Sequence, residues 1–84
     1  KDFPELDFSV FPNPTDGELM LKFANRNHYK IELFDNTGRL VLTKEMDGFQ
    51  SMLELSVVNQ GVYFLKVSTE NEFSSKKVIV AKSS

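Results

Sequence analysis

Phe11-Pro12-Asn13-Pro14-Thr15-Asp16-Gly17 is the stretch around which this chain is organised, and it lies between two short alternating runs. Each proline fixes its own φ angle, lacks an N–H group and favours an extended conformation in the residue before it. Asp16 and Gly17 then favour a turn, because glycine adopts positive φ without steric cost. The stretch therefore predicts the end of one strand, a few extended residues and a turn into the next strand.

Apolar residues that recur at every second position predict strands on both sides of this connector. The strands are expected at residues 8–11, 18–23, 29–33, 39–45, 49–55, 62–68 and 73–81. Their buried faces are expected to contain Leu19, Leu21, Phe23, Tyr29, Ile31, Leu33, Leu53 and Leu55. A polar connection at 24–28, a tight turn at 35–38 and a hairpin at Asp47-Gly48 are expected between strands. Seven short strands with this spacing predict an all-β fold, a small antiparallel immunoglobulin-like β-sandwich.

The length of 84 residues allows one domain. We expect residues 1–7 to be a linker, with only local packing of Phe3 and Leu6, and residues 8–84 to form the sandwich. Because the chain has no initiator methionine, we expect it to be a piece of a longer polypeptide. The net charge is −2 with both signs interspersed, which argues against a nucleic-acid-binding surface. The absence of cysteine excludes disulfides and thiolate metal sites, and no apolar run approaches the roughly 20 residues of a membrane helix.

The sequence offers few candidates for chemistry. His28 can be a general base or a metal ligand, but its polar neighbours at 25–27 favour an ordinary loop residue, and no serine stands in a nucleophile motif. Glu45, Asp47 and Glu54 can supply oxygen ligands for calcium, although no EF-hand spacing is present and surface carboxylates are usually solvated. We therefore expect no enzyme, no catalytic residue, no metal and no cofactor.

The aromatic residues are expected mainly in the core. Burial of strand aromatics gives a large hydrophobic gain, so Tyr63, Phe23 and Phe64 are predicted to be buried, and a sugar-stacking platform is the alternative. The strand at 62–68 is apolar on both faces, which predicts a central or covered position. For Phe11 two interpretations stay open, a docking side chain and a lid on one end of the sandwich.

Lysines gather near the end of the sequence, at Lys76, Lys77 and Lys82. They either bind acidic groups or keep an edge strand from pairing with other chains. Two glycines have structural explanations: Gly38 is expected to supply positive φ in a turn, and Gly61 to leave room for a backbone crossing.

These pieces, taken in order, resemble the type A C-terminal sorting domain of the type IX secretion system of Bacteroidetes. The matching residues are Phe11, Pro12, Asn13, Pro14 and Gly17 for a YPNP-x-x-G element with Phe in place of Tyr, Asp35, Gly38, Arg39 and Val41 for a D-x-x-G-R-x-V element, Gly61 and Tyr63 for a G-x-Y element, and the terminal run at 76–80. The resemblance covers roughly residues 8 to 84. No single piece is specific, whereas the ordered combination is.

The resemblance implies a secretion signal that directs an upstream cargo domain through the type IX machinery across the outer membrane. The implied partners are the outer-membrane translocon, shuttle and sortase components, and the implied location is the periplasm in transit, then the cell surface or the exterior. A sortase-like protease is expected to cut upstream of or within residues 1–7. Lys76 and Lys77 are implied recognition residues, because the family's machinery needs the terminal strand region. The runner-up is an accessory adhesion or carbohydrate-binding β-sandwich of a secreted multidomain enzyme.

Overall fold

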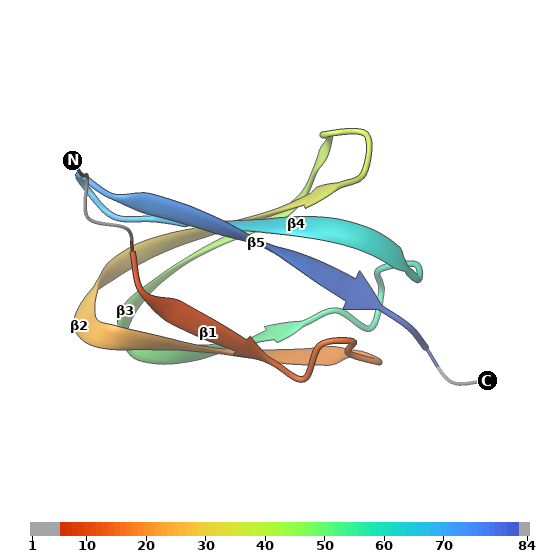
Figure 1. The fold of residues 1–84 in the computed structure, drawn as a ribbon, viewed down its shortest axis with the longest axis horizontal. Coiled ribbons are helices and arrows are strands. Elements are labelled where there is room, and N and C mark those ends of the chain that lie inside the picture. Colours follow the sequence, from red (N-terminus) through yellow and green to blue (C-terminus); the bar gives the residue numbers. More distant parts are fainter. Residues whose placement is uncertain (1–5, 83–84) are drawn as a thin grey trace.

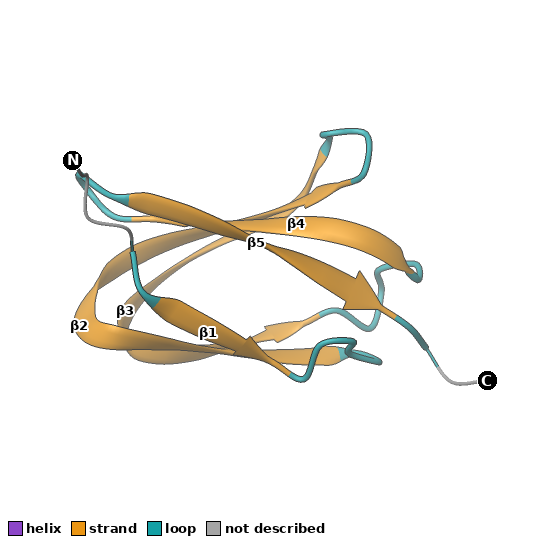
Figure 2. Ribbon diagram, viewed as in Figure 1, coloured by secondary structure: helices purple, strands orange, loops and turns teal. Residues whose placement is uncertain are grey.

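The structure is a computed structural model, and it describes residues 6–82. Figures 1 and 2 show that these residues form strands and loops. The strands are β1 (Phe8–Phe11), β2 (Glu18–Asp35), β3 (Leu40–Glu54), β4 (Gly61–Ser68) and β5 (Phe73–Val80). No helix occurs within residues 6–82, and the predicted all-β class is confirmed.

All strand pairs are antiparallel and belong to one sheet that curls over itself. The order is β1-β2-β4-β5, and β3 pairs with β2. The first part of β2 pairs with β1 and its last part with β4, while β3 follows β2 along both parts. Figure 1 shows the result: β1 and the start of β2 form a lower layer, and β4 and β5 form an upper layer. The core lies between these layers.

The predicted seven-strand immunoglobulin-like arrangement is not confirmed, because two predicted pairs of strands are continuous. Residues 18–23 and 29–33 both belong to β2, and the predicted strands at 39–45 and 49–55 both lie in β3 except for their outer residues, 39 and 55. The polar stretch at 24–28 stays in the strand, since Asn27 and His28 pair with Gly48 and Asp47. A strand continues wherever its backbone N–H and C=O groups pair with a neighbouring strand, so polar side chains that point to solvent do not interrupt it.

An irregularity in the β2–β3 pairing bends both strands from one layer to the other. Residues 23–26 of β2 lie opposite residue 49 of β3, between the pairs Lys22–Gln50 and Asn27–Gly48. Gly48 has a φ of 131°, a conformation that favours glycine. The expected hairpin at Asp47-Gly48 is therefore wrong, because this glycine serves a bulge inside a strand and not a chain reversal.

The core confirms the predicted inward faces. Its buried residues are Leu6, Phe8, Leu19, Leu21, Phe23, Tyr29, Ile31, Leu33, Leu53, Leu55, Val58, Tyr63, Leu65, Val67, Val78 and Val80. Every residue that the alternation predicted to be inward is among them. Leu6 also packs here, so the packed chain extends back at least to this residue, while Phe3 lies outside the described residues.

Strand β4 is central, between β2 and β5, but it is covered on one face only. Tyr63 is buried, whereas Val62 is 38% and Phe64 44% exposed. The predicted burial of Tyr63 and Phe23 is confirmed, and that of Phe64 is wrong. Neighbouring residues of a strand point to opposite faces, so a strand that buries Tyr63 directs Phe64 to the outer surface.

Candidate recognition surfaces

Asn13 joins the connector to the last strand of the sheet. Its side-chain Nδ2 donates to the carbonyl oxygen of Lys77 at 3.0 Å, and its Oδ1 accepts from the N–H of Ile79 at 3.0 Å. A neighbouring strand would offer β5 the same two groups, one donor and one acceptor, and the amide is a side chain that carries both. Asn13 therefore occupies the edge of β5 as a short substitute for a strand.

Thr15 continues this contact along the same edge. Its backbone N–H donates to the carbonyl oxygen of Ile79 at 2.9 Å, and its backbone carbonyl accepts from the N–H of Ala81 at 2.8 Å. These two hydrogen bonds form a parallel β-bridge between Thr15 and Val80. The side chain is only 1% exposed, and its hydroxyl donates to the carbonyl of Glu18. Sequence reasoning attributed the connector to its prolines and missed both contacts. The one available signal was the amide side chain of Asn13, which both donates and accepts, because Thr15 contacts the edge of β5 through its backbone.

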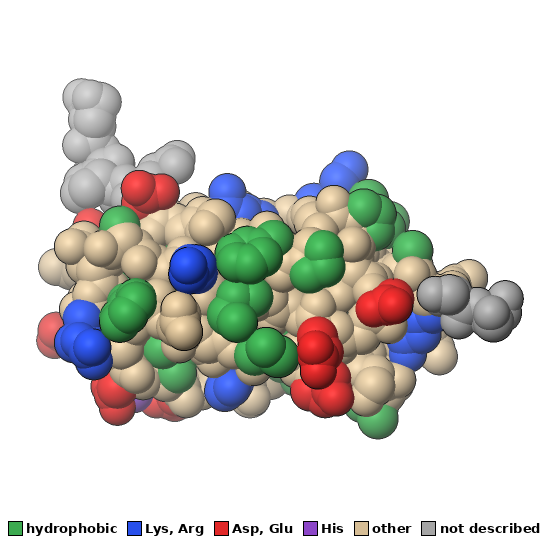
Figure 3. Space-filling view, turned by 90° about the horizontal axis from the view of Figure 1, so that it is seen from below, with side chains coloured by type: hydrophobic (Ala, Val, Ile, Leu, Met, Phe, Trp, Pro, Cys, Tyr) green, Lys and Arg blue, Asp and Glu red, His purple; other side chains and the backbone are tan. Residues whose placement is uncertain are grey.

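Phe11 and the two prolines lie on the surface beside this contact. The peptide bonds Phe11–Pro12 and Asn13–Pro14 are cis, and both prolines are exposed. Phe11 is 45% exposed and lies opposite Met20 of β2, which in turn lies opposite Met52 of β3. Figure 3 shows hydrophobic side chains gathered in the middle of this lower face. Phe11 is thus part of an exposed apolar row.

Lys76 and Lys77 leave β5 on opposite faces. Lys76 lies opposite the fully buried Leu65, and Lys77 lies opposite the exposed Phe64. The Nζ of Lys76 is 5.3 Å from the centroid of the Phe8 ring, within the range of a cation–π contact. A charged residue on the inner face of an edge strand opposes pairing with another chain. The two lysines therefore have different surroundings and are separable by mutation.

Asp35 and Arg39 close the hairpin between β2 and β3. The Oδ1 of Asp35 accepts from the N–H of Thr37 at 2.9 Å, from its hydroxyl at 2.6 Å and from the N–H of Arg39 at 3.1 Å. These hydrogen bonds, that of the Thr37 hydroxyl first, lower the pKa of the Asp35 carboxyl. Gly38 has a φ of 89°, as predicted for this turn. The motif therefore specifies a turn, and the Arg39 side chain stays 82% exposed.

The glycine–tyrosine motif, Gly61 and Tyr63, fixes the crossover into β4. The Tyr63 hydroxyl donates to the carbonyl of Asn59 at 2.6 Å, and the Lys82 Nζ donates to that of Ser56 at 2.6 Å. A Cβ at Gly61 would approach nothing closer than the Tyr63 ring at 3.8 Å, an ordinary contact. The expected tight backbone crossing at Gly61 is therefore wrong, and the feature that favours glycine at this position is its φ of 157°.

The part of the chain that carries these features matches a known family. A family model described as a secretion system C-terminal sorting domain covers residues 9–81. The chain belongs to the type IX secretion sorting-domain family. The predicted resemblance is confirmed, and the connector, the turn and the terminal strand of the sorting domain all lie inside the matched range. A comparison with curated proteins found no match.

The sorting domain is a C-terminal secretion signal of the type IX system. Such a signal implies export across the outer membrane, to the cell surface or outside. The carbohydrate-binding alternative is not favoured. Tyr63 and Phe23, which it would need as a stacking platform, are 8% and 6% exposed and face the core.

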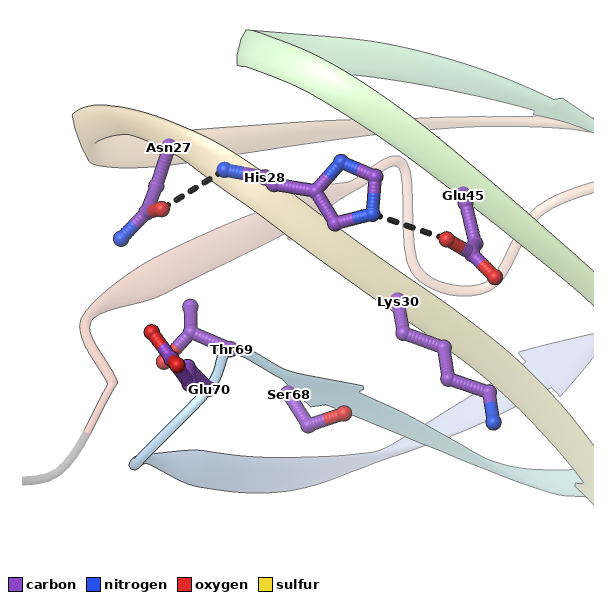
Figure 4. A pocket seen from close by; sticks show the side chains of 7 residues that line it. All are labelled: Asn27, His28, Lys30, Glu45, Ser68, Thr69 and Glu70. Carbon is purple, nitrogen blue, oxygen red and sulfur yellow. Dashed lines mark hydrogen bonds and ion pairs between the residues drawn. The ribbon is translucent and has the colours of Figure 1, made fainter.

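His28 of the sorting domain lies in β2, and the expected loop at this position is wrong. Its Nδ1 contacts Asp47 Oδ1 and its Nε2 contacts Glu45 Oε1, both at 2.8 Å. These hydrogen bonds, that to Asp47 first, raise the pKa of His28. Figure 4 shows the ring turned toward Glu45 beside a pocket of about 410 Å³, with Ser68 on another strand. Because both ring nitrogens contact carboxylates, the geometry is that of a cross-strand link and not of a base aimed at a serine.

The carboxylates considered for calcium are not brought together. Glu54 lies opposite Glu18 near one end of β3, whereas Glu45 and Asp47 lie on the far side of the bend at Gly48. Among residues 6–82, no group of three His, Cys, Asp or Glu side chains is arranged to hold a metal ion. The same described range contains no helix long and apolar enough to cross a membrane.

Proposed function

We propose that the type IX machinery reads the sorting domain as a folded unit, through the connector at 11–17 and the β5 strand that it contacts. The observation that carries this proposal is the hydrogen bond of Asn13 to Ile79, which spans 66 positions of sequence. Folding brings these two segments together, so an unfolded chain does not present them as one surface. A machine that exports unrelated cargoes needs a feature of the domain itself, and this composite surface supplies one.

Each part of the surface offers a different kind of contact. Phe11 supplies exposed apolar area, and rigid prolines at 12 and 14 lower the entropy lost on docking. Lys77 supplies positive charge. The connector bonds to residues 77–81 along the edge of β5, and the inward Lys76 disfavours addition of a partner strand to the rest of this edge. The remaining motif residues act as positioning residues for the fold, and these are Asp35, Gly38, Arg39, Gly61 and Tyr63.

The proposed route places the domain in the periplasm before export, where translocon, shuttle and sortase components are its partners. A sortase-like protease then removes it by a cut upstream of or within residues 1–7, the linker to the cargo. The packing of Leu6 in the core favours a cut before that residue, which leaves the domain whole. The domain itself has no catalytic role, in keeping with the engagement of His28 by two carboxylates.

The test is export of a reporter that carries residues 1–84 at its C-terminus and a periplasmic targeting signal at its N-terminus, in a bacterium with type IX machinery. We expect the reporter outside the cell only when the domain is present. Lys77→Glu should reduce export while folded reporter accumulates in the periplasm, and its melting temperature should stay within a few degrees, because exposed substitutions usually cost under about 0.5 kcal/mol. Lys76→Glu is made separately, and its export shows whether the lysine on the inner face of β5 is also needed.

Retention of the unmodified fusion in the periplasm would contradict the proposed route. Undiminished export of a folded Lys77→Glu fusion would exclude that lysine from recognition and direct attention to the proline connector.

A further inference from the structure

The outer face of the upper layer carries an apolar patch that no motif predicts. Strand register places Leu40 beside Phe34, Phe34 beside Phe64, and Phe64 beside Lys77, across β3, β2, β4 and β5. Leu40 is 47% and Phe64 44% exposed. The next outward pair on β4 and β5 is apolar as well, because Val62 lies opposite Ile79. These five apolar residues, here called the outer patch, are Phe34, Leu40, Val62, Phe64 and Ile79.

The outer patch is not accounted for by the stability of the fold. The core is complete on the opposite face of the same strands, where Leu33, Leu65 and Val78 are fully buried. Single exposed apolar residues are ordinary, whereas contiguous ones that span four strands are typical of interaction sites. An exposed apolar surface of this kind lowers solubility, and a partner that covers the surface offsets this loss.

The charges around the outer patch are mainly positive, although the whole chain has a net charge of −2. Lys77 ends the apolar row, and Lys66 follows Phe64 by two positions on the same face. Glu32 lies opposite Lys66, and its carboxylate is 3.9 Å from the Nζ of Lys30. Lys66 and Lys77 thus adjoin the patch, and Glu32 lies between Lys66 and Lys30. Farther along this face, Glu45 and Asp47 both contact His28.

We propose that the outer patch is a docking surface for a component of the secretion machinery whose own surface has an apolar centre and an acidic rim. This inference rests on the proposed function. The positive charge of Lys66 and Lys77 beside the outer patch indicates the kind of partner. A second copy of the chain is disfavoured, because a two-fold interface would bring two faces with the same excess of lysine together. An acidic rim instead complements them and directs the encounter.

The lower face provides the matched comparison. Its apolar row of Phe11, Met20 and Met52 crosses β1, β2 and β3. Figure 3 shows hydrophobic side chains in the middle of this face, among side chains of both charges. Lys22 lies on one side of this row, and Glu18 with Glu54 on the other. The lower row therefore selects no partner by charge, and Met52, at the β3 end of the row, is separated from Phe11 of the connector by Met20. Met52 is 45% exposed, nearly the same as Phe64, so the two residues form a pair of variants with equal exposure on opposite faces.

The experiment compares Phe64→Thr with Met52→Thr in the reporter fusion. Threonine keeps β propensity, and Val62→Thr, which preserves the branched shape, serves as a second patch variant that leaves the fold intact. We expect export to fall about tenfold in Phe64→Thr, the effect of losing one central anchor worth about 1.4 kcal/mol. Export should fall several-fold in Val62→Thr and remain at the wild-type level in Met52→Thr. Each variant chain is first shown to melt near the wild-type temperature.

Other occupants predict different outcomes. Equal export of Phe64→Thr and Met52→Thr overturns the proposal while the wild-type fusion still demonstrates sorting. Loss of export of the wild-type fusion itself overturns the proposed function and the inference with it. A purified wild-type chain that dimerises, and becomes monomeric in Phe64→Thr, assigns the patch to a second copy. If Phe64→Thr lowers export for only one of two unrelated reporters, the outer patch contacts the cargo. Dimerisation through the patch and a cargo-dependent defect each contradict docking to the machinery.

Discussion

Asn13→Asp tests whether the connector stabilises the terminal strand through a side chain that both donates and accepts. Aspartate keeps the acceptor that faces the N–H of Ile79, but it replaces the Nδ2 donor, 3.0 Å from the oxygen of Lys77, by a carboxylate oxygen. The loss of one hydrogen bond lowers the free energy of unfolding by about 0.5–1.5 kcal/mol. In addition, a carboxylate oxygen of the aspartate now faces the carbonyl oxygen of Lys77. Because the site is exposed, water relieves part of this repulsion, and we expect a total loss of about 1–2 kcal/mol.

The assay is thermal unfolding of the 84-residue chain at pH 7. For a domain of this size each kcal/mol corresponds to about 4–8 °C, so the melting temperature should fall by about 5–15 °C. The deficit should shrink below about pH 4, where the protonated carboxyl again donates to Lys77. Asn36→Asp is the control, because Asn36 is exposed in the hairpin turn and no side-chain hydrogen bond of it occurs among the described residues. A melting temperature of Asn13→Asp within 2 °C of the wild type at pH 7 would refute the reasoning.

Three further predictions concern the core and two titrating groups. Leu33→Ala should cost about 2–5 kcal/mol by denaturant unfolding, because Leu33 is fully buried, whereas the 90% exposed Val57 should tolerate alanine within about 0.5 kcal/mol; equal effects would contradict the core. The pKa of His28 should lie above 6.5 by NMR titration and fall in Asp47→Asn, and the associated stability is present below pH 6.5 and lost as pH rises through the raised pKa. The pKa of Asp35 should lie below 3.8, so its stabilisation is present above that pH and lost as pH falls through the lowered pKa; an unchanged acid limb of the stability profile in Asp35→Ala would argue against the turn.

The motifs could be recognised from sequence, but their physical roles could not. The connector was interpreted through Pro12 and Pro14, which act locally, whereas its main contacts are made by Asn13 and Thr15 to a strand at the other end of the chain. Nothing in the sequence near residue 13 indicates what lies across from it. For the same reason Lys76 and Lys77 looked like one basic unit, although the pleat of β5 sends them to opposite faces.

The sequence by itself determined which residues of β2 face inward, and it determined the family. A period of two follows from the geometry of any strand, so Leu19, Ile31 and Leu33 could be placed inward without knowledge of their partners. Only the tertiary structure decided where strands end, because continuity through the polar stretch at 24–28 depends on pairing with β3. It also decided which apolar residues stay outside: Phe64 is as hydrophobic as Phe23, and the difference between them is that no second layer covers the outer face of β4.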